Sequence, residues 1–232
     1  MDRFLALEWA NYALDLFLSS DDEEKNYELL SNQLKKEISG VESAQKTSIQ
    51  LKRLWLTEKN GKQDLRSIAK EIINNRTVVD YSIFHLGMAI NVFPIFYETC
   101  NKIGTLSKSH QKLSRQIIIR RVSETFANPT SIPRIVDRVI QTLIDWGFLL
   151  VNEDSLLVKQ VNLEDKEISS WFVFSLMKAS NCQEMTIPDL LSNPNKMGIN
   201  LGDIRSHINQ SSILKINRDT FGSEIISVIN LR

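Results

Sequence analysis

Apolar residues recur at helical spacing through the first third of the chain. The clearest stripe places Leu5, Trp9 and Leu16 one or two helical turns apart, which predicts a first helix. Acidic residues 21–24 suit the start of a second helix, because negative charge is favoured at the positive end of the helix dipole, and Gly40 suits its end. The same period predicts two further helices, over 42–56 and 65–72.

The middle of the chain shows a long apolar segment followed by two amphipathic ones. Residues 79–103 are expected to form one long helix with a kink at Pro94, since proline removes a backbone donor and clashes with the preceding turn. A second helix is expected over 112–127. A third helix follows a tight break, and either Ser131 or Thr130 is expected to cap its N-terminus.

The third helix is expected to end at Gly147, and a β-hairpin is expected directly after it. Two short apolar runs, 148–151 and 156–161, flank a polar four-residue turn, which is the pattern of two paired strands. Helix, helix, short turn, helix and hairpin is the order of a winged helix-turn-helix, with 134–146 in the position of the recognition helix. Residues 78–163 are therefore expected to form a winged-helix unit.

The same order recurs in the last third of the chain. A helix around Trp171 is followed by a capped helix start at Thr186 and by a third helix that Asn200 is expected to cap. Apolar runs over 213–216 and 225–229 predict a closing hairpin. The predicted fold is mainly α, with α+β character at the hairpins. It comprises an N-terminal helical unit and tandem winged helix-turn-helix units, over 1–77, 78–163 and 164–232.

Composition agrees with a folded, helix-rich chain. Hydrophobic residues make up 42% and charged residues 24%, while 8 Gly and 5 Pro among 232 residues are fewer than a turn-rich β architecture requires. The longest apolar run, 83–97, is shorter than the roughly 20 residues of a membrane span. Acidic residues inside the apolar N-terminal stretch argue against a signal peptide, and the distant Cys100 and Cys182 indicate no disulfide framework. We therefore expect a cytoplasmic protein.

Charge is balanced over the whole chain but not along it. The chain has 28 basic and 28 acidic side chains, so its formal net charge is zero. Residues 102–138, however, carry eight basic and two acidic side chains, whereas 1–60 and 139–167 have an acidic excess. An anionic partner responds to local charge, so the basic segment indicates binding to the phosphates of double-stranded DNA.

Arg134 and Arg138 lie one helical turn apart on the expected outer face of the recognition helix. Arginine side chains in that position can reach base edges or phosphates. Asp137 and Asp145 on the same helix reduce the local positive potential. Further candidate DNA-binding residues are a glutamine of that helix and cations of the neighbouring segments and of the last third: Gln141, Lys112, Arg115, Arg120, Arg121, Lys159, Arg205 and Arg218.

Enzymatic chemistry has no comparable support in the sequence. It contains none of the phosphate-binding, dinucleotide-binding, serine-hydrolase or zinc-protease motifs. Three scattered histidines and two scattered cysteines do not form a ligand set, so we expect no catalytic residue, no metal and no cofactor. His85 lies in an apolar run and is expected to be a core residue. The same holds for the tryptophans, which fall in apolar stripes: Trp9, Trp55, Trp146 and Trp171.

Several short patterns occur together along nearly the whole chain. They are Ser43, Thr47 and 51–55; 93–96; Leu113, Ser114, Val122 and Phe126; Ser131, Arg134, Leu143 and 146–149; and 190–194 with the final hairpin. Together they resemble BrxA, the small accessory protein of bacterial BREX phage-defence systems. The resemblance implies a non-enzymatic DNA-binding component encoded beside a methyltransferase, a phosphatase-like protein and ATPases. It also implies other defence-system proteins as partners.

Three interpretations remain open from the sequence. The first is a non-enzymatic DNA-binding accessory protein whose binding is mostly electrostatic. The second is a protein–protein adaptor or scaffold whose winged helices dock other proteins, with the basic helix faces merely solvated. The third is a transcriptional repressor, which requires a dimer and a palindromic site. The basic segment favours the first interpretation, because an adaptor does not need it.

Overall fold

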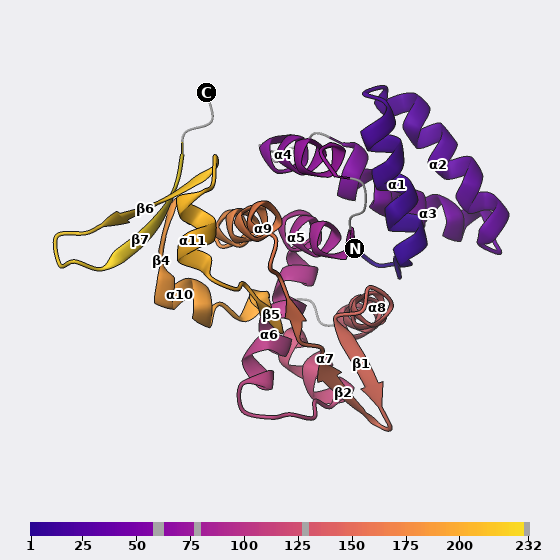
Figure 1. The fold of residues 1–232 in the computed structure, drawn as a ribbon. Helices are drawn as coiled ribbons and strands as arrows, with labels where there is room; N and C mark the ends of the chain where they lie inside the picture. The colour runs from indigo at the N-terminus through magenta and orange to yellow at the C-terminus, as the bar shows by residue number, and fades with distance from the viewer. Residues whose placement is uncertain (58–62, 77–79, 127–129, 230–232) are drawn as a thin grey trace.

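A computed structural model describes residues 1–57, 63–76, 80–126 and 130–229 of the chain. The protein is mainly helical, with 61% helix, 12% strand and small sheets, as predicted at this level (Figure 1). The N-terminal helices are α1 (Leu7–Ser19), α2 (Glu23–Glu37), α3 (Val41–Leu51) and α4 (Gln63–Asn74), with α3 continuing as a π-helical segment, η1 (Lys52–Leu56). The four helices predicted in this part are therefore present.

The prediction of one long, kinked helix over 79–103 is wrong, because two separate helices occupy this stretch. They are α5 (Ser82–Val92) and α6 (Pro94–Ser107), and their axes are bent by 113°. Phe93 between them is extended, with φ −120° and ψ 105°. The ring of Pro94 disfavours the helical conformation of the residue before it, which ends α5 there and lets proline begin α6.

Within the described residues, no single helix is long and apolar enough to cross a membrane, although the bent pair α5 and α6 would suffice by length and composition together.

The next region contains α7 (Arg115–Ser123), α8 (Ile132–Asp145) and the antiparallel hairpin β1 (Leu149–Asn152) and β2 (Ser155–Val158). The hairpin is as predicted, but the helix predicted over 112–127 is shorter. Leu113 is extended and exchanges two backbone hydrogen bonds of 2.8 Å with Leu156 of β2, so it cannot join α7. Ser131 precedes α8 with an already helical backbone, and its side chain makes no cap hydrogen bond.

The last region begins with α9 (Lys166–Ala179) and ends with a three-stranded sheet of order β4-β7-β6. Asp203 rather than Asn200 caps α11, because Asn200 pairs in a short parallel ladder and Asp203 accepts from the backbone of Ser206. Thr186 caps α10 as predicted. The remaining elements are β3 (Val161–Asn162), β4 (Glu184–Thr186), α10 (Ile187–Ser192), η2 (Pro194–Lys196), β5 (Ile199–Asn200), α11 (Ile204–Asn209), β6 (Leu214–Arg218) and β7 (Glu224–Val228).

The region with α7, α8 and the β1–β2 hairpin and the region from α9 to β7 share one strand topology. In the first, the extended residue Leu113 pairs with β2, which in turn pairs with β1, and α7 and α8 connect the two parts. In the second, β4 pairs with β7, which pairs with β6, and α10 and α11 form the connection. The sequence did not predict β4 or the Leu113 bridge, because both are too short to show an alternating pattern.

Helix α5 lies in the middle of the molecule and is buried along 82–90 (Figure 1). Gly87 is required where α9 crosses it, because a Cβ atom there would lie 2.5 Å from the ring of Trp171. His85 of α5 is fully buried, as predicted. Its Nδ1 accepts from the Trp55 indole at 2.9 Å, and its Nε2 donates to the Asn11 side-chain oxygen at 2.8 Å. Burial lowers the pKa of His85 to about 3, so the ring is neutral.

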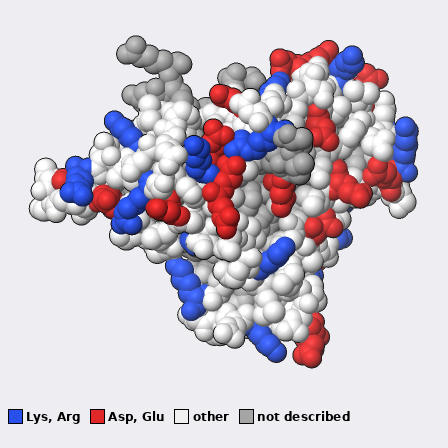
Figure 2. Space-filling model, viewed as in Figure 1, with Lys and Arg blue, Asp and Glu red and all other residues white. Residues whose placement is uncertain are grey.

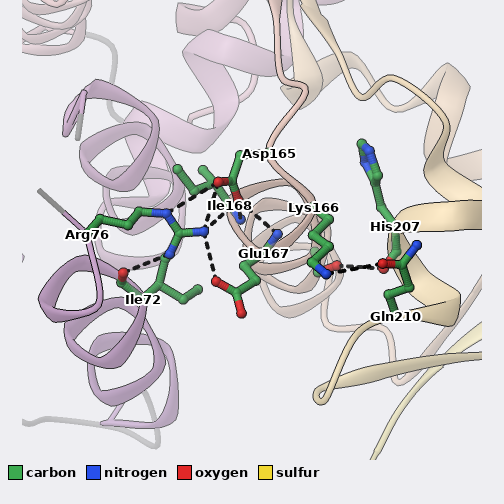
Figure 3. Close-up of polar contacts among 9 residues, drawn as sticks. Ile72, Arg76, Asp165, Lys166, Glu167, Ile168, His207 and Gln210 are labelled. Carbon is green, nitrogen blue, oxygen red and sulfur yellow. Dashed lines mark hydrogen bonds and ion pairs between the residues drawn. The ribbon is translucent and has the colours of Figure 1, made fainter. Parts of the chain in front are cut away.

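An ion-pair cluster joins the end of α4 to the start of α9 (Figure 3). The Arg76 guanidinium lies 2.8 Å from both carboxylate oxygens of Asp165 and 2.8 Å from Glu167. Asp165 also caps α9 by accepting from the backbone of Glu167 and Ile168. Partial burial acts to raise the pKa of Asp165, but the bonds from Arg76 and from the backbone outweigh it and hold the pKa below its usual value.

We expect this cluster to make stability depend on acid pH. The pKa of Asp165 is lower in the folded state than in the unfolded state, so its contribution is full above the unfolded value of about 3.9 and is lost as the pH falls through the folded value. Asp165→Asn should lower the unfolding temperature at pH 7 and have a smaller effect at about pH 3. Thermal melts across pH test this, with exposed Glu28→Gln as control; an equal difference at both pH values would contradict it.

Candidate nucleic-acid interface

Helix α8 presents one apolar face to the core and one polar face outward. Val136, Val139 and Leu143 are buried, whereas Arg134 is exposed and Arg138 is partly exposed. The apolar positions repeat every three or four residues, so the intervening charged positions are left on the opposite side. The predicted placement of the two arginines on the outer face therefore agrees with the burial pattern.

A polar network covers the middle of that face and ties α7 to α8. Arg115 of α7 pairs with Asp137 of α8 at 2.7 Å. Gln141 donates to the other Asp137 oxygen at 2.9 Å, and Arg138 donates to the Gln141 side-chain oxygen at 2.7 Å. Arg115, Arg138 and Gln141 are thus brought together as predicted candidates, but around an acidic residue. Asp137 neutralises part of the positive charge that the sequence suggested for this face.

The N-terminal segment covers the second half of α8, which the sequence did not predict. The backbone N–H of Leu5 donates to the Thr142 hydroxyl at 3.0 Å, and that of Leu7 donates to the Asp145 carboxylate at 2.6 Å. The Trp146 indole donates back to the carbonyl of Leu5 at 2.9 Å. Thr142 is fully buried as a result. Asp145 itself is exposed, so this contact covers the side of α8 around Thr142 and leaves the outer face with Arg134, Arg138 and Gln141 open to a partner.

The other cations of this region differ in their pairing. Arg120 and Arg121 lie 3.9 Å and 3.5 Å from Glu124, and all three side chains are exposed, so these weak pairs can rearrange. Within the described part of the chain, no ion pair is formed by three further exposed candidates: Lys112, Arg134 and Lys159. An open hollow at the start of α8 is lined by Asp2, Thr130, Ser131, Arg134 and Ile135.

The second region carries fewer free cations. Arg205 of α11 pairs with Glu224 of β7 at 2.8 Å, and Arg218 of β6 lies directly opposite Glu224 in the strand register. Glu224 therefore lies near both candidates, although only Arg205 forms an ion pair with it among the described residues. They lie on the last region and far along the chain from the α8 set, and no hydrogen bond or ion pair between described residues joins the two sets.

Acidic and basic side chains are interspersed on the face that Figure 2 shows. Acidic side chains gather over α1–α3, whereas the lower part, formed by α6, α7 and the β1–β2 hairpin, carries isolated basic ones. The tip of that hairpin is itself acidic, with Glu153 and Asp154 both exposed. No continuous basic area covers this view, so an anion that approaches this face would meet only local cations.

Groups that could support other chemistry are separated. Among the residues that the structure describes, no three His, Cys, Asp or Glu side chains lie close enough to hold a metal ion. Cys100 is buried, and burial raises the pKa of its thiol, whereas Cys182 is exposed. Trp55, Trp146 and Trp171 are buried as predicted, while Trp9 is only partly buried and donates to Glu37.

No model of a known protein family, no curated protein and no solved structure matches the chain significantly.

The contact between the N-terminal segment and α8 should contribute measurably to stability. Thr142→Val keeps the side-chain shape but leaves the buried N–H of Leu5 without its acceptor, which costs on the order of 1–3 kcal/mol of unfolding free energy. Chemical denaturation measures the change. Thr105→Val on the exposed face of α6 is the matched control and should be nearly neutral. If Thr142→Val were as stable as the Thr105→Val control, the predicted contribution of this hydrogen bond to stability would be wrong.

Proposed function

We propose that the protein is a non-enzymatic, double-stranded DNA-binding accessory protein in which the region 78–163 is a winged helix-turn-helix. In this proposal α7 and α8 are the helix-turn-helix, α8 is the recognition helix and β1–β2 is the wing. The second region, from α9 to β7, is proposed as a second winged helix. The shared strand topology of the two regions supports this assignment.

The exposed outer face of α8 is the observation that carries the proposal. Arg134 is exposed and forms no ion pair among the described residues, and Arg138 and Gln141 lie on the same side of the helix. A recognition helix contacts DNA through its N-terminal residues, and Arg134 lies in the first turn of α8, where it lines an open hollow with Asp2 of the N-terminal segment. Arginine and glutamine are also the side chains that pair with guanine and adenine edges.

The mixed charge of the surface sets the expected strength of binding. Asp137 and Glu124 each hold one or two of the candidate arginines, so few cations are free to replace counterions on DNA. Binding should therefore be weak, in the micromolar range, similar for unrelated duplexes, and strongly reduced by salt. The acidic tip of β1–β2 would be repelled by phosphates, so this wing is expected to lie away from the backbone.

A role in bacterial phage defence is part of the same proposal. Its support is the resemblance of residue pattern to BrxA, which includes Ser131, Arg134 and Leu143 of the α8 segment. In the structure, Ser131 is the exposed residue before α8, and Arg134 is exposed and forms no ion pair among the described residues. Leu143 lies on the buried face of the same helix. Other defence-system proteins are the partners that this role requires. The adaptor interpretation gains support only if substitutions on the α8 face leave DNA-binding affinity unchanged.

Replacing Arg134 and Arg138 together by Glu should weaken DNA binding about tenfold or more. Each lost arginine contact is worth on the order of 1–3 kcal/mol, and the added negative charge repels the backbone. Arg134 is exposed, and exposed substitutions usually change stability by under about 0.5 kcal/mol; Arg138 is partly exposed and donates to Gln141, so thermal melts check that the variant is folded. Fluorescence anisotropy with one labelled duplex, at several salt concentrations, measures the affinity.

The matched control is Lys35→Glu with Lys36→Glu on α2, which changes the net charge equally at an exposed site far from α8 along the chain. The control should bind almost as the unmodified protein does. Arg205→Glu and Arg218→Glu should have a smaller effect than the α8 pair. Equal affinity of a well-folded α8 variant and the unmodified protein would remove α8 from DNA contact and favour the adaptor.

A further inference from the structure

The β6–β7 hairpin presents a single aromatic side chain at its tip. Phe221 is 91% exposed, more than any other large apolar side chain in the described residues. In Figure 1 this hairpin projects from the body, with its turn farthest from the other elements. An apolar ring held in water loses the free energy that burial would give it, so its position at a projecting tip is consistent with burial in a partner.

The turn that carries Phe221 is fixed by hydrogen bonds. One carboxylate oxygen of Asp219 accepts from the backbone N–H of Phe221 at 2.9 Å and from that of Ser223 at 2.8 Å. The N–H of Asp219 donates to the carbonyl of Ser223, and Gly222 adopts φ +82°. The ring is therefore presented by an ordered backbone, which reduces the entropy lost on binding. The Asp219 carboxylate is directed at these N–H groups.

The surroundings of the ring fit nucleic acid better than a protein surface. Thr220, Gly222 and Ser223 beside it are polar or small and exposed, so Phe221 is not part of an extended apolar patch of the kind that marks a protein–protein interface. Two cations of β6, Lys215 and Arg218, are exposed and form no ion pair within the described part of the chain. A narrow tip with one apolar side chain and nearby cations suits the minor groove, which is only about 6 Å wide.

We infer that β6–β7 is a DNA-contacting wing that inserts Phe221 as an apolar wedge between base pairs in the minor groove of duplex DNA. This inference rests on the proposed function and names a contact that the proposal for α8 does not contain. Arg218 would hold a phosphate beside the wedge. The Arg205–Glu224 pair ties α11 to the first residue of β7, next to the turn, so helix and wing would approach the duplex together. The acidic tip of β1–β2 offers no equivalent wedge.

Duplexes that contain 2-aminopurine test the wedge, because this base becomes more fluorescent when it is unstacked. The unmodified protein should bind and raise the emission. Phe221→Ala should bind about tenfold more weakly and give no rise, since losing an aromatic contact with a base has an effect of this size. Phe221→Leu, which keeps a wedge, should recover part of both signals. Val41→Ala, at another exposed apolar position, is the control and should change neither.

Salt dependence separates the wedge from the cations. Phe221→Ala removes no charge and should leave the slope of log affinity against log salt unchanged, whereas Arg218→Ala should reduce it by about one. A Phe221→Ala variant that matches the unmodified protein in affinity and emission on duplex DNA overturns the inference and leaves the tip to a protein partner. An effect of Phe221→Ala that is confined to binding of single-stranded DNA also overturns the inference.

The outcomes also separate this inference from the proposed function. If the unmodified protein binds no duplex at low salt, the proposed function fails and the wedge fails with it. If binding is lost in the Arg134/Arg138 variant but is unaffected by Phe221→Ala, only the wedge fails. Thermal melts show whether each variant is folded, and the exposure of Phe221 means that its replacement should leave the melting temperature unchanged.

Discussion

The fold depends on the burial of α5 along residues 82–90. This helix is covered by α9, α6, η1 and α4, so every polar group on it needs a partner inside the protein. His85 is satisfied between the Trp55 indole and Asn11, and Asn91 donates to the carbonyl of Ser175 on α9. Gly87 lets Trp171 approach. The three regions of the chain thus meet on one helix, which makes them a single packed structure.

That arrangement determines which surfaces are left for a partner. The inner faces of α8 and α9 are used for packing, and the Arg76–Asp165 cluster fixes α9 against α4. The N-terminal segment then contacts one side of the second half of α8 through Thr142, Asp145 and Trp146. Among the surfaces that stay exposed are the outer face of α8 around Arg134 and the projecting β6–β7 hairpin. The two proposed DNA contacts lie on these two elements.

The sequence predicted well those elements that carry a repeating apolar pattern. It predicted poorly those that are one to three residues long or depend on contacts between distant residues. Stripes of apolar residues located nearly all the helices, and the hairpin after Gly147 was visible from two apolar runs around a polar turn. The break at Pro94 was predicted as a kink, although proline also constrains Phe93 and separates two helices. The Leu113 bridge, β4 and the cap by Asp203 depend on tertiary contacts of one to three residues, which no periodic pattern reports.

The sequence indicated which cations lie on and beside α8, but not which acidic side chains pair with them. Local charge pointed to Arg115, Arg134 and Arg138, and periodicity placed the last two on the outer face of α8. The Asp137 network and the cover over Thr142 arise from residues distant in sequence, so charge counting overestimated the free positive surface. Phe221 was missed because a single apolar residue in a turn carries no pattern; its exposure is evident only in three dimensions.

Hydrogen–deuterium exchange with and without duplex DNA is the most direct test of where DNA binds. We expect slower exchange on DNA binding in the first turns of α8 and at the tip of β6–β7, and no change in α2, which lies in the acidic N-terminal part. Protection confined to α1–α3, or bound DNA that changes exchange in neither α8 nor the β6–β7 tip, would contradict DNA binding through these surfaces.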